Sequence, residues 1–379
     1  MYLGEQFKFN ENECYRPTRM EINTQFVREN FRDLKKLAGR SEVIAAVKGN
    51  AYSHGIVPIS KILYEEGCNW FAVAIIEEAL ALREAGIDRN ILVMGAAPRS
   101  GAEAVVKNDI ICACGNLEFA SALAQAAKKL NKPTRVHIKI DSGMGRIGFF
   151  PNMAADAAVK ISGMGISIEG AFTHFATSEE KDLDYTRWQF AQFMEAVDSM
   201  EGRGVKIPFK HVCNSGAILS CPEMYLDGVR TGKLLYGIPL PGKPRPFPAR
   251  PIVEVKTAIS DIRTLPPKSG ISYGLKYMTR AELKIGVIPM GSLDGFSRLN
   301  PAPEVLVRGV RVPAVGTVCM DQTMLDLSRV PDAAIDDEVV VIGKQGNEEI
   351  TLTELVGKLN TIYSQALALF PFRMPRFYK

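Results

Sequence analysis

The most constraining feature of this sequence is a strand-then-helix pattern that repeats eight times in the first two-thirds of its 379 residues. Short apolar runs alternate with amphipathic stretches. Most runs are continuous rather than alternating, as expected for strands buried on both faces. They cover residues 42–48, 70–75, 91–95, 110–114, 135–141, 166–175, 209–215 and 227–237. Eight such units in about 230 residues predict a closed (β/α)8 barrel, which typically takes about 250 residues.

A second domain follows the barrel, because the pattern changes after about Gly242. Residues 243–251, KPRPFPARP, are too rich in proline to continue a helix and are typical of a linker. Beyond them, strands separated by Gly, Pro and Asp turns predict a mainly-β domain with one short helix, Leu352 to Leu359, capped by Thr351. The predicted segments are 1–17, a candidate for an additional strand of the β domain, 18–242, the barrel, and 243–379, the β domain.

Composition narrows the classes of function. The formal net charge is only +4 and no long basic run occurs, so no nucleic-acid partner is expected. The seven cysteines include no CxxC pair, which predicts neither a disulfide framework nor a metal site and favours a reducing, cytoplasmic location. No segment approaches the roughly 20 apolar residues of a membrane helix, and the N-terminus has no signal-peptide pattern, so no membrane association is expected.

Candidate site residues stand where the predicted strands end. Catalytic groups of a barrel lie at the C-terminal ends of its strands and in the loops that follow. Polar or cationic groups, or glycine, occur there at Lys48, Lys139, Asp141, Arg146, His174, His211, Asn214, Ser215, Arg230 and Gly232. Such a ring of groups favours an anionic ligand.

Lys48 has two interpretations from the residues alone. It is either an ordinary solvated amine or a Schiff-base lysine, whose pKa is lowered because it follows apolar residues 45–47 at the end of a strand.

Eight segments, in order from about Arg16 to Tyr378, resemble motifs of the alanine racemase family. The first, AAVKGNAYSHG, is similar to the motif that carries the lysine for pyridoxal phosphate (PLP). The others are HIKIDSGMGRIGF, THFATSEE, HVCNSGA, VRTGKLLYG, ISYGLKY, TVCMDQTMLDL and FRMPRFY. The resemblance implies a PLP-binding barrel with a C-terminal β domain. It also implies a homodimer in which the barrel of one subunit and the β domain of the other share an active site.

The resemblance implies two bases for the racemisation of an amino acid. Lys48 would hold PLP and act on one face of the substrate Cα, and Tyr273 of the partner chain would act on the opposite face. By itself, Tyr273 is an aromatic residue of a strand, and a phenol with a pKa of about 10 is a poor base without help from its neighbours.

Other roles follow from the same resemblance. The expected cofactor-binding groups are Lys48, Tyr52, His174, Ser215, Arg230 and the backbone amides of Gly232 and Lys233. Arg146 is expected to orient the substrate carboxylate or the phenol, and Met320 of the partner chain is expected to offer its backbone amide to the carboxylate. Lys139 is a candidate for carbamylation. Asp321 is expected to be structural.

Several positions depart from the family pattern. Ser292 and Phe296 replace tyrosines, Thr317 replaces an arginine, and Phe372 replaces a tyrosine that reaches the phosphate in many members. These changes predict a wider and less basic entrance to the site. They leave open whether the substrate is alanine or a larger amino acid such as serine or lysine.

Two further alternatives differ in class. A non-catalytic PLP-binding barrel would need neither Tyr273 nor a β domain. A PLP decarboxylase of related fold would place a cysteine opposite the cofactor, for which Cys319 is the candidate.

Overall fold

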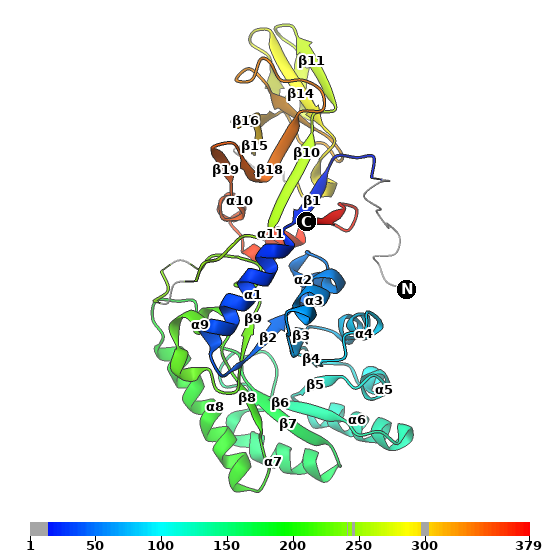
Figure 1. The fold of residues 1–379 in the computed structure, drawn as a ribbon, viewed down its shortest axis with the longest axis vertical. Helices are drawn as coiled ribbons and strands as arrows, with labels where there is room; N and C mark the ends of the chain where they lie inside the picture. The colour runs from blue at the N-terminus through cyan, green and yellow to red at the C-terminus, as the bar shows by residue number, and fades with distance from the viewer. Residues whose placement is uncertain (1–13, 241, 245–246, 297–302) are drawn as a thin grey trace. The chain divides into compact units, whose positions relative to one another are not determined.

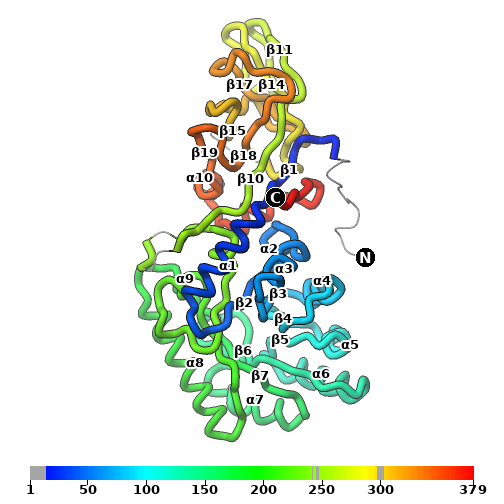
Figure 2. Tube along the Cα trace, in the orientation of Figure 1, coloured from blue at the N-terminus to red at the C-terminus, as the bar shows by residue number. Residues whose placement is uncertain are grey.

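The computed structural model describes residues 14–240, 242–244, 247–296 and 303–379, and Figures 1 and 2 show the path of the chain. The described chain forms two compact units. The barrel unit comprises residues 25–51 and 55–251. The β unit comprises the described residues up to Thr24 together with residues 52–54 and 252–379.

The barrel unit is built on a closed sheet of eight parallel strands in chain order. The strands are β2 (Glu42–Ala46), β3 (Trp70–Val73), β4 (Asn90–Val93), β5 (Ile111–Cys114), β6 (Arg135–Lys139), β7 (Ser167–Phe172), β8 (Phe209–His211) and β9 (Gly228–Thr231). β9 pairs with β2, with Glu42 opposite Gly228, which closes the barrel. Each predicted run contains one strand, so the predicted barrel is confirmed. The strands are shorter than the runs, because the last residues of most runs turn away from the sheet.

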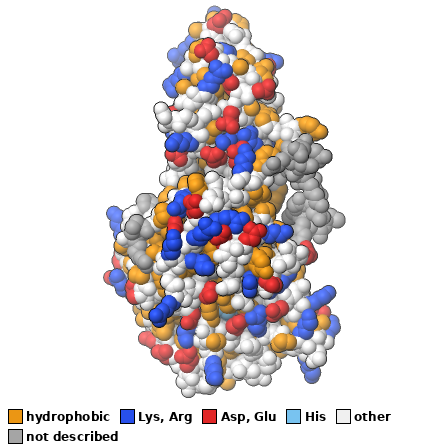
Figure 3. All heavy atoms as spheres, in the orientation of Figure 1, with side chains coloured by type: hydrophobic (Ala, Val, Ile, Leu, Met, Phe, Trp, Pro, Cys, Tyr) orange, Lys and Arg blue, Asp and Glu red, His pale blue; other side chains and the backbone are white. Residues whose placement is uncertain are grey.

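Helices surround these strands in Figure 1. They are α1 (Thr24–Ala38), α3 (Ile56–Glu65), α4 (Ile76–Glu84), α5 (Ala102–Lys107), α6 (Leu117–Leu130), α7 (Pro151–Gly163), α8 (Asp184–Gly202) and the short α9 (Ser215–Ser220). α1 shows why the sequence forms this layer, because Val27, Phe31 and Leu34 recur at helical spacing and are buried, whereas Lys35 lies in the last turn. Positive and negative side chains are interspersed on the face of the molecule that Figure 3 shows.

Burial explains the continuous apolar runs. Every residue of β3 and β5 is buried, as expected for strands with the barrel interior on one face and helices on the other. Inside the barrel, Ile44, Trp70 and Leu92 belong to one apolar cluster. This packed interior fixes the strand ends, and therefore the residues that follow them.

The β unit consists mainly of one ten-stranded sheet in the order β11-β14-β17-β16-β15-β18-β10-β1-β20, with β19 paired to β18. Its strands are β1 (Arg19–Ile22), β10 (Val253–Ala258), β11 (Asp261–Leu265), β14 (Leu283–Ile288), β15 (Glu304–Val307), β16 (Val310–Val315), β17 (Thr323–Asp326), β18 (Glu338–Gln345), β19 (Glu348–Ile350) and β20 (Arg376–Tyr378). A separate pair joins β12 (Gly270–Ile271) to β13 (Tyr277–Met278), and two helices, α10 (Leu352–Leu359) and α11 (Tyr363–Ala368), follow β19. The mainly-β C-terminal domain of the predicted fold is confirmed.

The N-terminal strand of the β unit is β1, which pairs with β10 in antiparallel fashion and with β20 in parallel fashion. The additional strand predicted within 1–17 falls largely on residues 1–13, which lie outside the described residues. Because β1 belongs to this sheet, the described residues up to Thr24 belong to the β unit.

Local signals placed the predicted helix of this unit correctly. The Thr351 side chain accepts a hydrogen bond from the Glu354 amide at 3.1 Å, and α10 covers Leu352–Leu359, as predicted. Among the described residues, no helix combines the length and the hydropathy that a membrane span requires.

Candidate active site

Lys48 lies just beyond the end of β2, where it begins the five-residue segment α2 (Lys48–Tyr52). Its side chain is half-buried. Burial lowers the pKa of the Lys48 amine, and the positive charges of Arg146 and Arg230 lower it further, whereas Glu78 raises it. A lowered pKa leaves more of the amine unprotonated, and only the unprotonated amine forms a Schiff base.

The backbone after Lys48 has an unusual conformation. Residues Gly49, Asn50, Ala51, Tyr52 and Ser53 all have a positive φ, between 52° and 71°. For residues other than glycine this left-handed conformation costs roughly 1–2 kcal/mol each. This left-handed segment was not predicted from the sequence, because only Gly49 and Asn50 are residue types that indicate such a conformation. Strain of this kind is concentrated at functional sites.

Arg230 is the central cation of the site. It lies in β9, is buried, and donates hydrogen bonds to the backbone oxygens of Thr173, His211 and Val212 at 2.7–2.9 Å. Its guanidinium also lies 2.7 Å from Nδ1 of His211 and 3.5 Å from Nδ1 of His174. Burial, opposed by Cys213 and reinforced by Arg146, lowers the pKa of Arg230 to about 10, so the group keeps its charge at neutral pH.

The contacts of Arg230 fix the tautomers of two buried histidines. A guanidinium has only donors, so Nδ1 of His211 must accept. Neutral His211 then carries its hydrogen on Nε2 and donates it to Nδ1 of His137 at 2.8 Å, which leaves the hydrogen of His137 on Nε2. Burial, with Arg135 and Arg230, lowers the pKa of His137 to about 3, and burial also lowers that of His211. Both rings are therefore neutral at neutral pH.

The tautomers can be tested by nitrogen NMR, since the chain has only four histidines. In ¹⁵N-labelled protein we expect both His137 and His211 as Nε2–H tautomers that do not titrate between about pH 6 and 8. His137→Phe and His211→Phe variants assign the signals. A hydrogen on Nδ1 of His211, or a charged ring at neutral pH, would contradict the arrangement.

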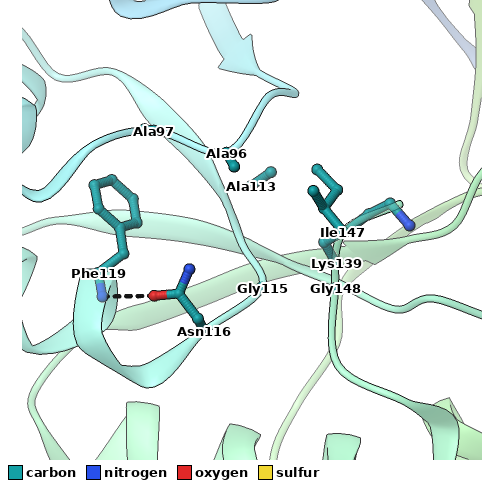
Figure 4. A pocket seen from close by; sticks show the side chains of 9 residues that line it. All are labelled: Ala96, Ala97, Ala113, Gly115, Asn116, Phe119, Lys139, Ile147 and Gly148. Carbon is teal, nitrogen blue, oxygen red and sulfur yellow. Dashed lines mark hydrogen bonds between the residues drawn. The ribbon is translucent and has the colours of Figure 1, made fainter. Parts of the chain in front are cut away.

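Lys139, the last residue of β6, lines a cavity of about 140 Å³. Figure 4 shows it with Ile147 and Gly148 on one side, opposite Asn116 and Phe119. The other lining residues are Ala96, Ala97, Ala113 and Gly115. The side chain is 1% exposed, and its Nζ donates to the Ile140 backbone oxygen at 2.7 Å. Burial, opposed by the carboxylate of Asp141, lowers the pKa of Lys139 to about 8.

Asp141 organises the loop that carries Arg146. Its carboxylate accepts hydrogen bonds at 2.8–3.1 Å from four consecutive backbone amides, those of Gly143, Met144, Gly145 and Arg146. Burial raises the pKa of the Asp141 carboxyl, but these amides outweigh it and hold the pKa below its usual value. Asp141 was predicted at the barrel mouth without a role. In the structure it holds the loop that carries Arg146.

Ser215 and Gly232 lie side by side at the ends of β8 and β9. The Gly232 amide donates to the Ser215 hydroxyl at 3.3 Å, and this hydroxyl lies 3.5 Å from that of Thr231. Asn214 caps α9 by accepting from the Ala217 amide at 3.1 Å. Hydroxyl and amide donors at the start of a helix suit a phosphate.

The remaining cofactor-binding candidates are Lys233, Tyr52 and His174. The Lys233 ammonium pairs with Glu179 at 2.6 Å, so only its backbone amide remains a candidate phosphate donor. Tyr52, the last residue of α2, has a positive φ and is half-buried. His174 is near enough to Lys48, Lys139, Arg146 and Arg230 for their charges to lower its pKa, although burial is the larger cause.

Besides Tyr52, two candidates belong to the β unit and not to the barrel unit. Tyr273 lies in the turn between β12 and β13, where its side chain is 68% exposed, and Met320 is 57% exposed. Thr317 donates to the Tyr273 backbone oxygen at 2.9 Å, and Ser272 donates to the Thr317 oxygen at 2.5 Å. These bonds hold the turn against the segment that follows β16. Tyr273 was interpreted as a strand residue from the pattern alone, and the structure places it in a turn.

A chain of ion pairs beside Met320 was not predicted from the sequence. Asp294 is fully buried and pairs with Arg16 and Arg373, each at 2.8 Å. Arg373 also pairs with Asp321 at 2.7 Å, consistent with a structural role for Asp321. The charged partners lie far apart in the sequence, so local pattern gives no signal for them.

The other positions that depart from the family pattern also lie in the β unit. The Ser292 amide donates to the Cys319 backbone oxygen at 2.9 Å. Phe296 is buried, whereas Phe372 is 48% exposed.

The barrel unit thus gathers an amine of lowered pKa, a buried guanidinium, and hydroxyl and amide donors at the start of a helix. PLP presents an aldehyde, a ring nitrogen and a phosphate, and these residues fit the three groups. Within the described ranges, no cluster of His, Cys, Asp or Glu could hold a metal ion. The fold and the site define a PLP enzyme of the barrel class.

Comparison with known proteins gives the family. Models of the alanine racemase N-terminal and C-terminal domains match residues 22–239 and 252–378. Alanine racemase 2 of Caldanaerobacter subterraneus subsp. tengcongensis is 42% identical over 368 residues, which cover 96% of this chain and 95% of that protein.

Solved structures agree. Alanine racemase of Clostridium difficile 630 has a TM-score of 0.92 at 36% identity, covering 97% of this chain and 96% of the other. Alanine racemase of Bacillus anthracis with bound L-Ala-P has a TM-score of 0.91 at 34% identity, covering 96% and 95%. The chain belongs to the alanine racemase family, whose members use PLP. The match over residues 252–378 disfavours a single-domain PLP-binding barrel.

Proposed function

We propose that the protein interconverts L- and D-alanine, using PLP held by Lys48, and that a homodimer forms each active site from two subunits. Membership of the family supports the reaction. The observation that carries the proposal is the half-buried amine of Lys48, whose pKa is lowered by burial and by the charges of Arg146 and Arg230. Exposure of Tyr273 supports the shared site, because a side chain that is 68% exposed is accessible to a second subunit.

The cofactor is assigned to the barrel mouth. Lys48 would provide the amine, Arg230 would lie toward the ring nitrogen, and Ser215 with the amides of Gly232 and Lys233 would bind the phosphate. Tyr52 would add a hydroxyl to the phosphate, and His174 would continue the polar chain from Arg230. The Arg230 guanidinium keeps its charge at neutral pH and would therefore oppose protonation of the ring nitrogen. When bound, PLP delocalises the electron pair that deprotonation leaves at the substrate Cα.

Two bases on opposite faces of the Cα explain racemisation. The unprotonated Lys48 amine takes the α-proton on one face, and the phenol of the partner subunit's Tyr273 gives a proton on the other. The roles reverse for the opposite enantiomer. Arg146, held by the Asp141 loop, and the backbone amide of the partner subunit's Met320 would orient the substrate carboxylate. A carboxylate fixed at both sides keeps the Cα between the two bases.

Lys139 is proposed to be carbamylated, since its pKa of about 8 makes a neutral amine available near neutral pH. A carbamate would turn the buried cation into an anion beside Arg146 and Arg230. Protein equilibrated with ¹³C-bicarbonate should show a carbamate carbon resonance that Lys139→Ala removes and Lys128→Ala retains. If the resonance persists in Lys139→Ala as well as in Lys128→Ala, the assignment to Lys139 is contradicted.

The substrate is tested by turnover of alanine, serine and lysine in D₂O, with deuterium at Cα measured by proton NMR. We expect both enantiomers of alanine to exchange and interconvert faster than those of serine or lysine. A larger preferred substrate is the second candidate, because Ser292, Thr317 and Phe372 replace bulkier or more polar groups. Faster turnover of serine or lysine would favour that candidate. Exchange of no amino acid would contradict racemase function.

A further inference from the structure

The segment after Lys48 combines an unusual backbone conformation with hydrogen bonds to a side chain outside it. Gly49 to Ser53 form five consecutive residues with positive φ, and Ala51, Tyr52 and Ser53 have side chains that disfavour this conformation. The Ala51 amide donates to the Val47 oxygen at 2.7 Å, and the Gly55 amide to the Asn50 oxygen at 3.0 Å. The first two amides of the segment, those of Gly49 and Asn50, instead donate to a side chain.

That side chain is Glu78, in the first turn of α4. Its Oε1 accepts from the Gly49 amide at 2.5 Å and from the Asn50 amide at 3.3 Å. Its Oε2 accepts from the Ala74 amide at 2.8 Å, just after β3. One carboxylate therefore joins the segment after β2 to the end of the neighbouring strand. Successive backbone amides of a tight turn form a concave site for an anion, and Glu78 fills it from within the protein.

Glu78 also acts on the charge of Lys48. The ionisable groups that affect this amine are Arg146 and Arg230, which disfavour its protonated form, and Glu78, which favours it. His174 is also near Lys48 but is neutral, because burial lowers its pKa well below the usual value. Glu78 is thus the negative charge that opposes two positive ones at this amine.

We propose that Glu78 is a positioning residue, which holds the left-handed segment after Lys48 in place and so sets the direction and the electrostatic surroundings of the Lys48 amine. The inference deepens the proposed function, since it concerns the lysine to which PLP is assigned. The geometry carries it, because a single carboxylate accepts from three backbone amides around that lysine. Loss of this carboxylate frees the segment to relax and leaves the amine facing two cations.

The test uses the full chain without PLP and four variants, Glu78→Ala, Glu78→Gln, Glu78→Asp and Glu118→Gln. Glu78→Ala removes both acceptors and the charge. Glu78→Gln removes the charge and presents an NH₂ group toward an amide donor. Glu118→Gln is the matched control, because Glu118 is an exposed glutamate in the first turn of another barrel helix, α6. Circular dichroism of each variant checks that the fold is retained.

Two measurements follow. Amide hydrogen exchange of peptides covering residues 49–53 should be about tenfold faster or more in Glu78→Ala, with the β5–β6 peptides unchanged. Competitive acylation of the Lys48 amine as a function of pH should show a midpoint at lower pH in Glu78→Gln, because the opposing anion is lost. Glu118→Gln should match the wild type in both. If Glu78→Ala does not fold, both measurements are made on Glu78→Gln, for which we expect the same directions.

The outcomes separate the two proposals. Unchanged exchange and an unchanged acylation midpoint in the Glu78 variants would overturn the positioning role, whether or not the wild type racemises alanine. Shifts in both measurements with an inactive wild-type protein would support the positioning role and contradict the proposed function. Partial recovery of the midpoint, but not of amide protection, in Glu78→Asp would support the role, because that variant restores the charge at a shorter reach.

Discussion

Replacing Lys48 by alanine should abolish the visible absorption of lysine-bound PLP and lower racemisation by at least on the order of 10³-fold. The reason is that, in the proposed mechanism, this one amine both holds the cofactor and exchanges a proton with the Cα. Its place at the end of β2, where burial and two arginines lower its pKa, suits both tasks. The measurement is an absorption spectrum after PLP addition, together with the rate of conversion of each alanine enantiomer.

Lys128→Ala is the control for this experiment. Lys128 is an exposed lysine in the last turn of α6, so its loss should alter neither the spectrum nor the rate. Retention of the cofactor band in Lys48→Ala would assign PLP to another amine and would remove the basis of the mechanism.

Replacing Tyr273 by phenylalanine should leave the cofactor band intact and reduce racemisation by roughly 10²–10⁴-fold, the usual contribution of a general acid or base. The loss should be uneven. One enantiomer should still exchange its α-proton with D₂O through Lys48, whereas the other should not, because the base on its face is missing. Proton NMR of L- and D-alanine in D₂O measures each exchange separately.

Tyr277→Phe is the matched control, since Tyr277 lies in β13, four residues away, and loses the same hydroxyl group. Its exchange rates should equal those of the wild type. Full activity of Tyr273→Phe with both enantiomers would contradict the two-base scheme.

The fold could be predicted because its signals are local. Buried parallel strands give continuous apolar runs, and each of the eight runs contains a strand. The limits of α10 were also predictable, since the cap Thr351 and the helix it starts are adjacent in sequence. The strand ends were less accurate, because β2 ends at Ala46 and not at Lys48. Apolar character continues past the last residue of the sheet and hides its end.

The site was predictable only in part. Residues that carry the chemistry stand in recognisable motifs at the strand ends, and the barrel unit brings Lys48, Arg146 and Arg230 near one another. The residues that support them through hydrogen bonds were not predicted, because hydrogen bonds between residues far apart in the sequence leave no local pattern. The contact of His137 with His211 joins residues 74 positions apart, and that of Glu78 with Gly49 spans 29.

The most direct test of the shared active site is a hybrid dimer that pairs a Lys48→Ala subunit with a Tyr273→Phe subunit, purified through a different tag on each. If each site takes Lys48 from one subunit and Tyr273 from the other, one of the two sites in the hybrid is intact. The hybrid dimer should then racemise alanine at about half the rate of the wild-type dimer. Activity no higher than that of the two parent variants, or failure to form any dimer, would contradict the account.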